Sequence, residues 1–131
     1  MTCGYGRHAV IEGASFSFGR GEIVALVGAN GTGKSTLMKT IAAAIRPLAG
    51  TVAVCGEEVH RLSKKEVALL VGYVPQIESP AFDFTVAEVV LMGRVPHSDG
   101  LFETREDHAA AAAAMERADC ASLRDRPMSE L

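Results

Sequence analysis

The chain of 131 residues has the length of one domain, and its 48% hydrophobic and 22% charged residues are typical of a globular protein rather than a disordered one. Its formal net charge of -3 comes from 13 basic and 16 acidic residues, so it lacks the basic excess that binds a nucleic-acid backbone. No stretch approaches the roughly 18 apolar residues of a membrane-spanning helix, and the widely spaced cysteines show no zinc-binding pattern and suit a reducing compartment.

Strands are the first elements expected along the chain. Residues 14–18 alternate between small or polar and aromatic side chains, which predicts an outer strand with one buried face. Residues 22–27 form a nearly continuous apolar run ending at Gly28, as does a strand buried on both faces of a parallel sheet. A further strand is expected at 51–55 and turns at Gly56. The first and last of these are expected to be antiparallel additions.

The segment 28–35 has the sequence GANGTGKS, the GxxxxGK[ST] pattern of a phosphate-binding loop. Its glycines let the main chain curl around phosphates, and the helix that follows directs free amides and its positive dipole end at them. Lys34 supplies a charge for the β and γ phosphates, Ser35 offers a hydroxyl oxygen suited to Mg²⁺, and Thr36 can bond a further phosphate oxygen. The residues assigned to nucleotide binding in this segment are Gly28, Asn30, Gly31, Thr32, Gly33, Lys34, Ser35 and Thr36.

The alternative interpretation of this segment is a flexible turn with a solvated lysine. A buried strand before the loop and an amphipathic helix after it, with apolar residues recurring from Leu37 to Ile45, favour phosphate binding. The helix is expected to stop at residues 46–50, where Pro47 and Gly50 lie. We therefore expect ATP with Mg²⁺ as the ligand.

Helices dominate the second half of the chain. Ser63 is expected to cap a helix at 64–70, after which 71–75 is extended and ends on Gln76. Thr85, with Glu88 three residues later, forms a capping box for a helix at 86–93, and an alanine-rich helix is expected at 105–119.

Residues 21–37 and 72–76 resemble the Walker A and Q-loop segments of ABC transporter nucleotide-binding subunits. The resemblance covers nearly the whole chain. It implies an α/β P-loop NTPase fold of the ABC type, truncated, with antiparallel outer strands and a partial parallel core sheet followed by the start of a helical subdomain. Residues 1–131 would form a partial ATP-binding domain, in which 1–76 are the P-loop core with outer strands and 77–131 are the Q-loop exit and the helical subdomain.

The resemblance also implies roles for two residues outside the loop. Gln76 would be the Q-loop glutamine, a catalytic residue together with Lys34 and a contact to Mg²⁺ together with Ser35. Tyr5 resembles the aromatic residue that stacks on adenine. The alternatives are a polar residue at the end of a strand for Gln76 and an ordinary terminal residue for Tyr5.

Residues 82–97 are most similar to import ATPases that serve iron-siderophore, haem and cobalamin permeases. The resemblance implies an ATP-binding subunit that couples ATP binding and hydrolysis to uptake, pairs with a second nucleotide-binding subunit, and lies at the cytoplasmic face of the membrane on the permease. Exposed Phe82, Phe84 and Met92 would contact the permease, although as core residues they would need no partner.

The family's motifs for completing catalysis are not matched. Residues 129–131 resemble the lead into the signature motif. The Walker B carboxylates and the switch histidine have no counterpart in the sequence. Glu57 and Glu58 are not interpreted as Walker B carboxylates, because they follow a glycine in a hairpin turn. We therefore interpret the sequence as the N-terminal part of such a subunit. The alternatives are a nucleotide-binding fragment without hydrolysis and, less favoured, another P-loop NTPase such as a small kinase.

Overall fold

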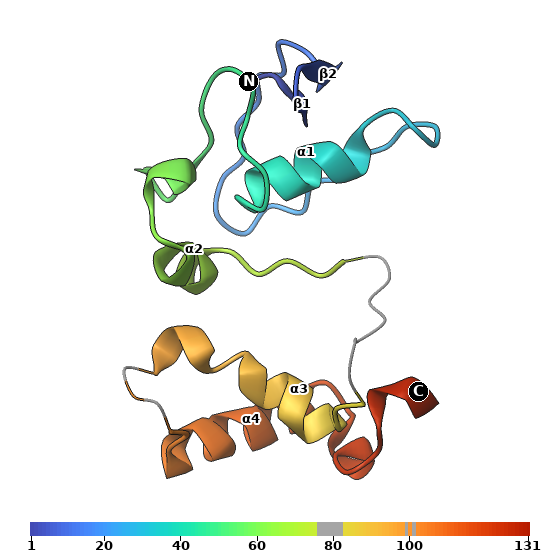
Figure 1. The fold of residues 1–131 in the computed structure, drawn as a ribbon, viewed down its shortest axis with the longest axis vertical. Helices are drawn as coiled ribbons and strands as arrows, with labels where there is room; N and C mark the ends of the chain where they lie inside the picture. Colours follow the sequence, from blue (N-terminus) through green and yellow to red (C-terminus); the bar gives the residue numbers. More distant parts are fainter. Residues whose placement is uncertain (76–82, 99, 101) are drawn as a thin grey trace. The chain divides into compact units, whose positions relative to one another are not determined.

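The computed structural model describes residues 1–75, 83–98, 100 and 102–131 (Figure 1). The chain forms two compact units, Met1–Tyr73 and Val74–Leu131. The strands and α-helices of the first unit are β1 (Cys3–Tyr5), β2 (His8–Ile11), α1 (Lys34–Ile41), β3 (Ala53–Val54), β4 (Glu57–Glu58) and α2 (Lys64–Leu70), with a 3-10 turn at Val59–Arg61. The α-helices of the second are α3 (Val86–Met92) and α4 (Arg105–Arg117), with 3-10 turns at Val95–His97, Ala121–Leu123 and Met128–Glu130.

The β1–β2 hairpin at the start of the first unit has no counterpart among the strands expected from the sequence. Its strands are antiparallel, and α1 packs against β1 (Figure 1). Cys3 of β1 and Thr40 of α1 are fully buried, and Leu37, Val52 and Val59 complete the core of this unit. The hairpin therefore covers the helix that follows the glycine-rich loop.

The β3–β4 hairpin confirms the turn expected at Gly56. Val54 pairs with Glu57, so only Cys55 and Gly56 form the loop, and their φ angles of 53° and 86° are the positive pair that a tight type I′ turn requires. The first strand is shorter than the predicted 51–55. Glu57 and Glu58 form the returning strand, in agreement with their interpretation as hairpin residues.

Two strand predictions are wrong, because neither 14–18 nor 22–27 is a strand in the described part of the chain. A parallel strand gains its hydrogen bonds from strands that are distant in sequence, and no described segment, including 71–75, pairs with 22–27. Ile23 is accordingly fully exposed. Alternation does place the Phe16 and Phe18 rings on the same side, where they stack with centroids 6.1 Å apart, but without a neighbouring strand. The partial parallel sheet is not observed among the described residues.

Helix α1 ends at Ile41, earlier than the apolar periodicity predicts. Ala43 has a positive φ of 55°, its amide donates to the Thr40 carbonyl at 3.1 Å, and the Ala44 amide donates to the Lys39 carbonyl at 2.9 Å. These bonds are those of a Schellman motif, which satisfies carbonyls that the next helical turn would otherwise use. The chain therefore leaves the helix before Pro47 can interrupt it.

The second unit is built on α3 and α4, which pack along each other (Figure 1). The capping box predicted at Thr85 is confirmed, since the Thr85 amide donates to Glu88 Oε2 at 2.8 Å and the Glu88 amide donates to Thr85 Oγ1 at 3.3 Å. Ser63 caps α2 in the same way, as predicted. None of the helices in the described residues combines the length and apolar character required to cross a membrane.

A partly buried ion pair joins the residues that follow α3 to the first turn of α4. Arg94 Nε lies 2.9 Å from Asp107 Oδ1, and Asp107 is only 4% exposed. Hydrogen bonds from the Thr104 hydroxyl and amide, and then from Arg94, lower the pKa of Asp107 to about 2. Asp107 is therefore charged at neutral pH and holds three donors, which fixes the start of α4.

Candidate functional site

The glycine-rich loop leads directly into α1. Gly31 and Gly33 have positive φ angles of 81° and 92°, a conformation that glycine adopts without strain. Gly33 is the N-cap of α1, and no side chain caps the first turn of this helix. The amides of that turn therefore remain available for an anionic ligand.

Lys34, the first residue of α1, lies across the loop. Its ammonium group donates to the carbonyl oxygens of Gly28 and Ala29, both at 2.7 Å. The Thr32 hydroxyl donates to the Ala29 carbonyl as well, at 2.8 Å. These bonds close the loop on itself and hold the positive charge of Lys34 beside the backbone that the sequence assigns to phosphates.

The space around each glycine shows where the loop is open and where it is packed. A Cβ built at Gly31 would meet nothing within 4 Å, whereas one at Gly33 would lie 2.6 Å from Val10 Cγ1 and 2.9 Å from Ile11 Cγ1. The side facing β2 therefore has no room for a side chain, and the side at Gly31 is open. The uncapped amides of the first turn of α1, the Lys34 ammonium group and the open position at Gly31 are features that suit a polyphosphate.

The structure places the other predicted residues as follows. Ser35 is exposed in the first turn of α1, where its hydroxyl oxygen could coordinate a metal ion, while Thr36 is only 7% exposed. Asn30 is exposed in the loop, and Tyr5 ends β1 with half of its surface exposed. Gln76 lies outside the described residues. Among the described residues, no cluster of three or more His, Cys, Asp or Glu side chains could hold a metal ion.

Val10 and Ile11, the two residues that lie against Gly33, are not marked by any pattern in the sequence. They belong to no motif, and their apolar side chains give no signal that separates them from core residues. Only the fold of the β1–β2 hairpin shows that they reach the loop.

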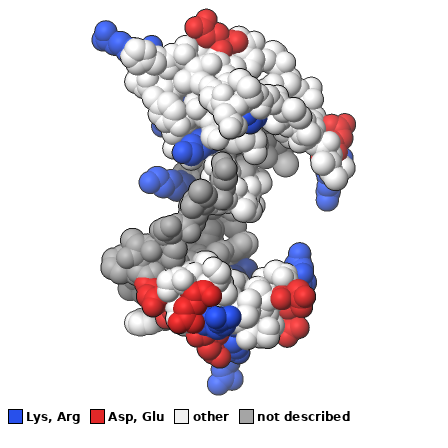
Figure 2. Space-filling view, turned by 90° about the vertical axis from the view of Figure 1, so that its right-hand side faces the viewer, with Lys and Arg blue, Asp and Glu red and all other residues white. Residues whose placement is uncertain are grey.

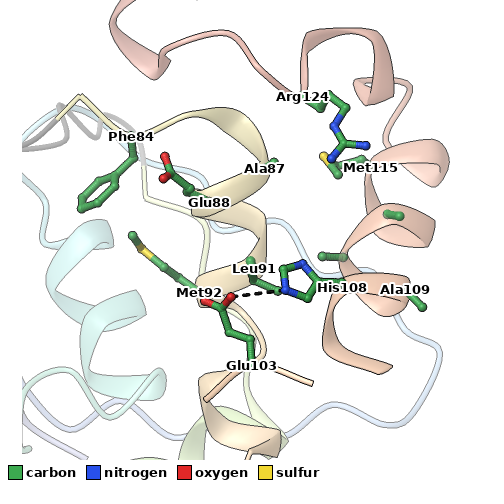
Figure 3. A pocket seen from close by; sticks show the side chains of 12 residues that line it. Phe84, Ala87, Glu88, Leu91, Met92, Glu103, His108, Ala109, Met115 and Arg124 are labelled. Carbon is green, nitrogen blue, oxygen red and sulfur yellow. Dashed lines mark ion pairs between the residues drawn. The ribbon is translucent and has the colours of Figure 1, made fainter. Parts of the chain in front are cut away.

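The second unit contains a cavity of about 690 Å³ at α3 and α4, and side chains of both helices line it (Figure 3). Phe84 and Met92, two of the three predicted permease contacts, line it, and the third, Phe82, lies outside the described residues. Glu103 Oε2 lies 3.3 Å from His108 Nε2 at its edge (Figure 3). On the face shown in Figure 2, acidic and basic side chains are interspersed, which agrees with the small net charge.

Residues 11–131 match the ABC transporter family. The chain is 47% identical over 106 residues to the hemin import ATP-binding protein of Gloeobacter violaceus, which covers 81% of this chain and 38% of that protein. It is 35% identical over an alignment of 132 positions to the iron(3+)-hydroxamate import ATP-binding protein of Bacillus subtilis, and this alignment covers 100% of this chain and 49% of that protein. With the cobalamin import ATP-binding protein of Halobacterium salinarum it shares 40% identity over 122 residues, 93% of this chain and 30% of that protein. The chain spans less than half the length of these three curated relatives.

Proposed function

The chain belongs to the ABC transporter family, and we propose that its loop 28–35 binds Mg·ATP within the ATP-binding subunit of an importer. The position of Lys34 supports this proposal. Its ammonium group lies 2.7 Å from two carbonyl oxygens of the glycine-rich loop, beside the uncapped first turn of α1. One side chain charge and several backbone donors thus converge on one short stretch of chain.

In this proposal the residues of the loop have separate roles. The amides from Gly31 to Thr36 hold phosphate oxygens, and Lys34 exchanges its bonds to the two carbonyls for bonds to the β and γ phosphates. Ser35 offers the hydroxyl oxygen that a hard cation such as Mg²⁺ accepts. Tyr5 stacks on adenine, and Gln76 contacts the metal or the attacking water.

The partners proposed for the whole subunit follow from the relatives and from the second unit. Relatives are named for hemin, iron(3+)-hydroxamate and cobalamin import, and we propose a solute of this class. The partial apolar wall formed by Phe84 and Met92 in the second unit supports contact with a membrane permease. A second copy of the subunit and a place at the cytoplasmic face of the membrane belong to the same proposal.

Calorimetric titration with Mg·ATP tests the assignment of the site. Lys34→Ala removes the charge at the loop and is expected to abolish measurable binding. Lys39→Ala removes a lysine of the same helix that is exposed and is expected to bind as the wild-type chain does. Equal affinity of the Lys34→Ala and wild-type chains would contradict the assigned site.

A second candidate function for these 131 residues is nucleotide binding without turnover. It is favoured by the sequence, in which no apolar run ends in the Asp-Glu pair that holds the metal and activates water. We expect ATPase activity of the isolated chain to equal background. Steady phosphate release that disappears with Lys34→Ala would exclude this candidate in favour of hydrolysis.

A further inference from the structure

The β1–β2 hairpin contains a β-bulge at Val10. Gly4 pairs with Ala9, but the residue before it in β1, Cys3, pairs with Ile11, so Val10 has no partner in β1. In a regular strand, neighbouring side chains point to opposite faces, whereas a bulge turns the extra residue and re-aims its side chain. The bulge explains how two consecutive side chains can reach the same place.

That place is the last glycine of the phosphate loop. The position of a Cβ on Gly33 lies 2.6 Å from Val10 Cγ1, and 2.9 Å and 3.1 Å from Ile11 Cγ1 and Cδ1. Gly33 holds a φ of 92° and is the residue at which the loop becomes α1. Two branched side chains therefore occupy the space beside Gly33, where the loop passes into α1.

We propose that Val10 and Ile11 are positioning residues that hold Gly33, and through it the amides of the loop, in the conformation that receives phosphates. This inference rests on the proposed binding of Mg·ATP by the loop. Amides that are already in place lose little entropy when a ligand binds. Side chains that hold the loop in its binding conformation therefore raise its affinity for phosphates without contacting the ligand. Val and Ile suit this role because their branched side chains are stiff at χ1.

Strand β1 of the same hairpin ends at Tyr5, which pairs with His8 beside the turn. If Tyr5 stacks on adenine, the hairpin serves both ends of the nucleotide by different means. The aromatic ring acts on the base and the two aliphatic side chains act on the phosphate loop. This difference separates the effects of the two kinds of substitution in a binding experiment.

The test compares Mg·ATP with magnesium tripolyphosphate, which has no base, in calorimetric titrations of the 131-residue chain. Val10→Ala combined with Ile11→Ala is expected to lower the affinity for both ligands by the same factor of about tenfold. Tyr5→Ala is expected to lower only the affinity for Mg·ATP. Val10→Ile and Ile11→Val, which keep branched side chains, are expected to bind both ligands within about twofold of wild type. Val95→Ala, a 69% exposed valine outside the hairpin, is the matched control and should change neither affinity.

A merely structural role gives a different result, because it lowers the melting temperature but leaves the affinity of the folded chain unchanged at a temperature well below melting. Unchanged affinities in the folded double variant would overturn the proposal. If the wild-type chain binds neither ligand, the proposed function fails, and the positioning role fails with it. Wild-type binding that is lost with Lys34→Ala but retained in the double variant overturns the positioning role only.

A second set of variants keeps the proposal testable if the double variant does not fold. The single variants Val10→Ala and Ile11→Ala each remove one of the two side chains that lie against Gly33, and each should weaken the binding of Mg·ATP and of magnesium tripolyphosphate by about threefold. Folded single variants that both bind the two ligands as the wild-type chain does would show that the contact does not control the loop.

Discussion

Truncation of Met115 in α4 provides a quantitative test of the packing in the second unit. Its side chain is 5% exposed and lines the cavity between α3 and α4, so Met115→Ala removes nearly the whole apolar contribution of a methionine and enlarges the cavity. Buried Met→Ala substitutions cost about 2–5 kcal/mol. Because Met115 borders an existing cavity, few neighbouring side chains can move in to fill the space that its truncation leaves. We therefore expect the free energy of unfolding to fall by about 3 kcal/mol.

Met92 of α3 is the matched control, because it lines the same cavity but is 46% exposed. Half of its apolar surface already faces water, so Met92→Ala should cost about 1 kcal/mol or less. The free energy of unfolding is measured for both variants by urea titration followed by circular dichroism, with hydrogen exchange of α4 amides to confirm that the second unit is the part affected. Equal losses for the two variants would refute the packing described between α3 and α4.

Three further predictions concern the local structure. Thr85→Ala removes the cap of α3 and should destabilise it by about 1 kcal/mol, seen as faster hydrogen exchange at Val86–Met92, whereas Thr51→Ala, at an exposed site outside any cap, should not. Folding lowers the pKa of Asp107 from its ordinary value of 3.8 to about 2. Its stabilising contribution is therefore full above about pH 5 and is lost as the pH falls through about 4 to about 2. This part of the acid transition should be absent in Asp107→Asn and unchanged in the exposed-site control Asp125→Asn. Cys55→Asn should raise stability by about 0.5 kcal/mol in thermal unfolding, since Asn tolerates the positive φ of 53° better than Cys does, and a loss of stability would contradict the type I′ turn.

Local signals in the sequence were sufficient for the helix starts and the second hairpin. Ser63 and Thr85 cap the helices predicted for them, because a capping box depends on residues within one turn of each other. The turn at Gly56 depends on two neighbouring φ angles and is also local. The glycine-rich loop at 28–35 was recognised by its sequence pattern, and in the structure the Lys34 ammonium group donates to the Gly28 and Ala29 carbonyls within it.

Features that depend on distant segments were not predicted. The apolar run at 22–27 has the composition of a buried strand, but composition does not show which segment pairs with it, and Ile23 is exposed in the structure. The packing of Val10 and Ile11 on Gly33 joins residues more than twenty positions apart through a bulge that has no sequence signature. The early end of α1 at Ile41 depends on a non-glycine residue, Ala43, adopting a positive φ, which propensity does not anticipate.

Binding of the phosphates of Mg·ATP by the backbone amides of the loop and Lys34 can be observed one residue at a time. In two-dimensional NMR spectra of the ¹⁵N-labelled chain, recorded as Mg·ATP is added, each glycine amide gives its own signal. We expect saturable shifts of the Gly31, Gly33 and Ser35 amides in the wild-type chain and none in Lys34→Ala. Amides of the loop that stay unshifted at millimolar Mg·ATP, or that shift equally in both chains, would show that the loop does not bind the phosphates.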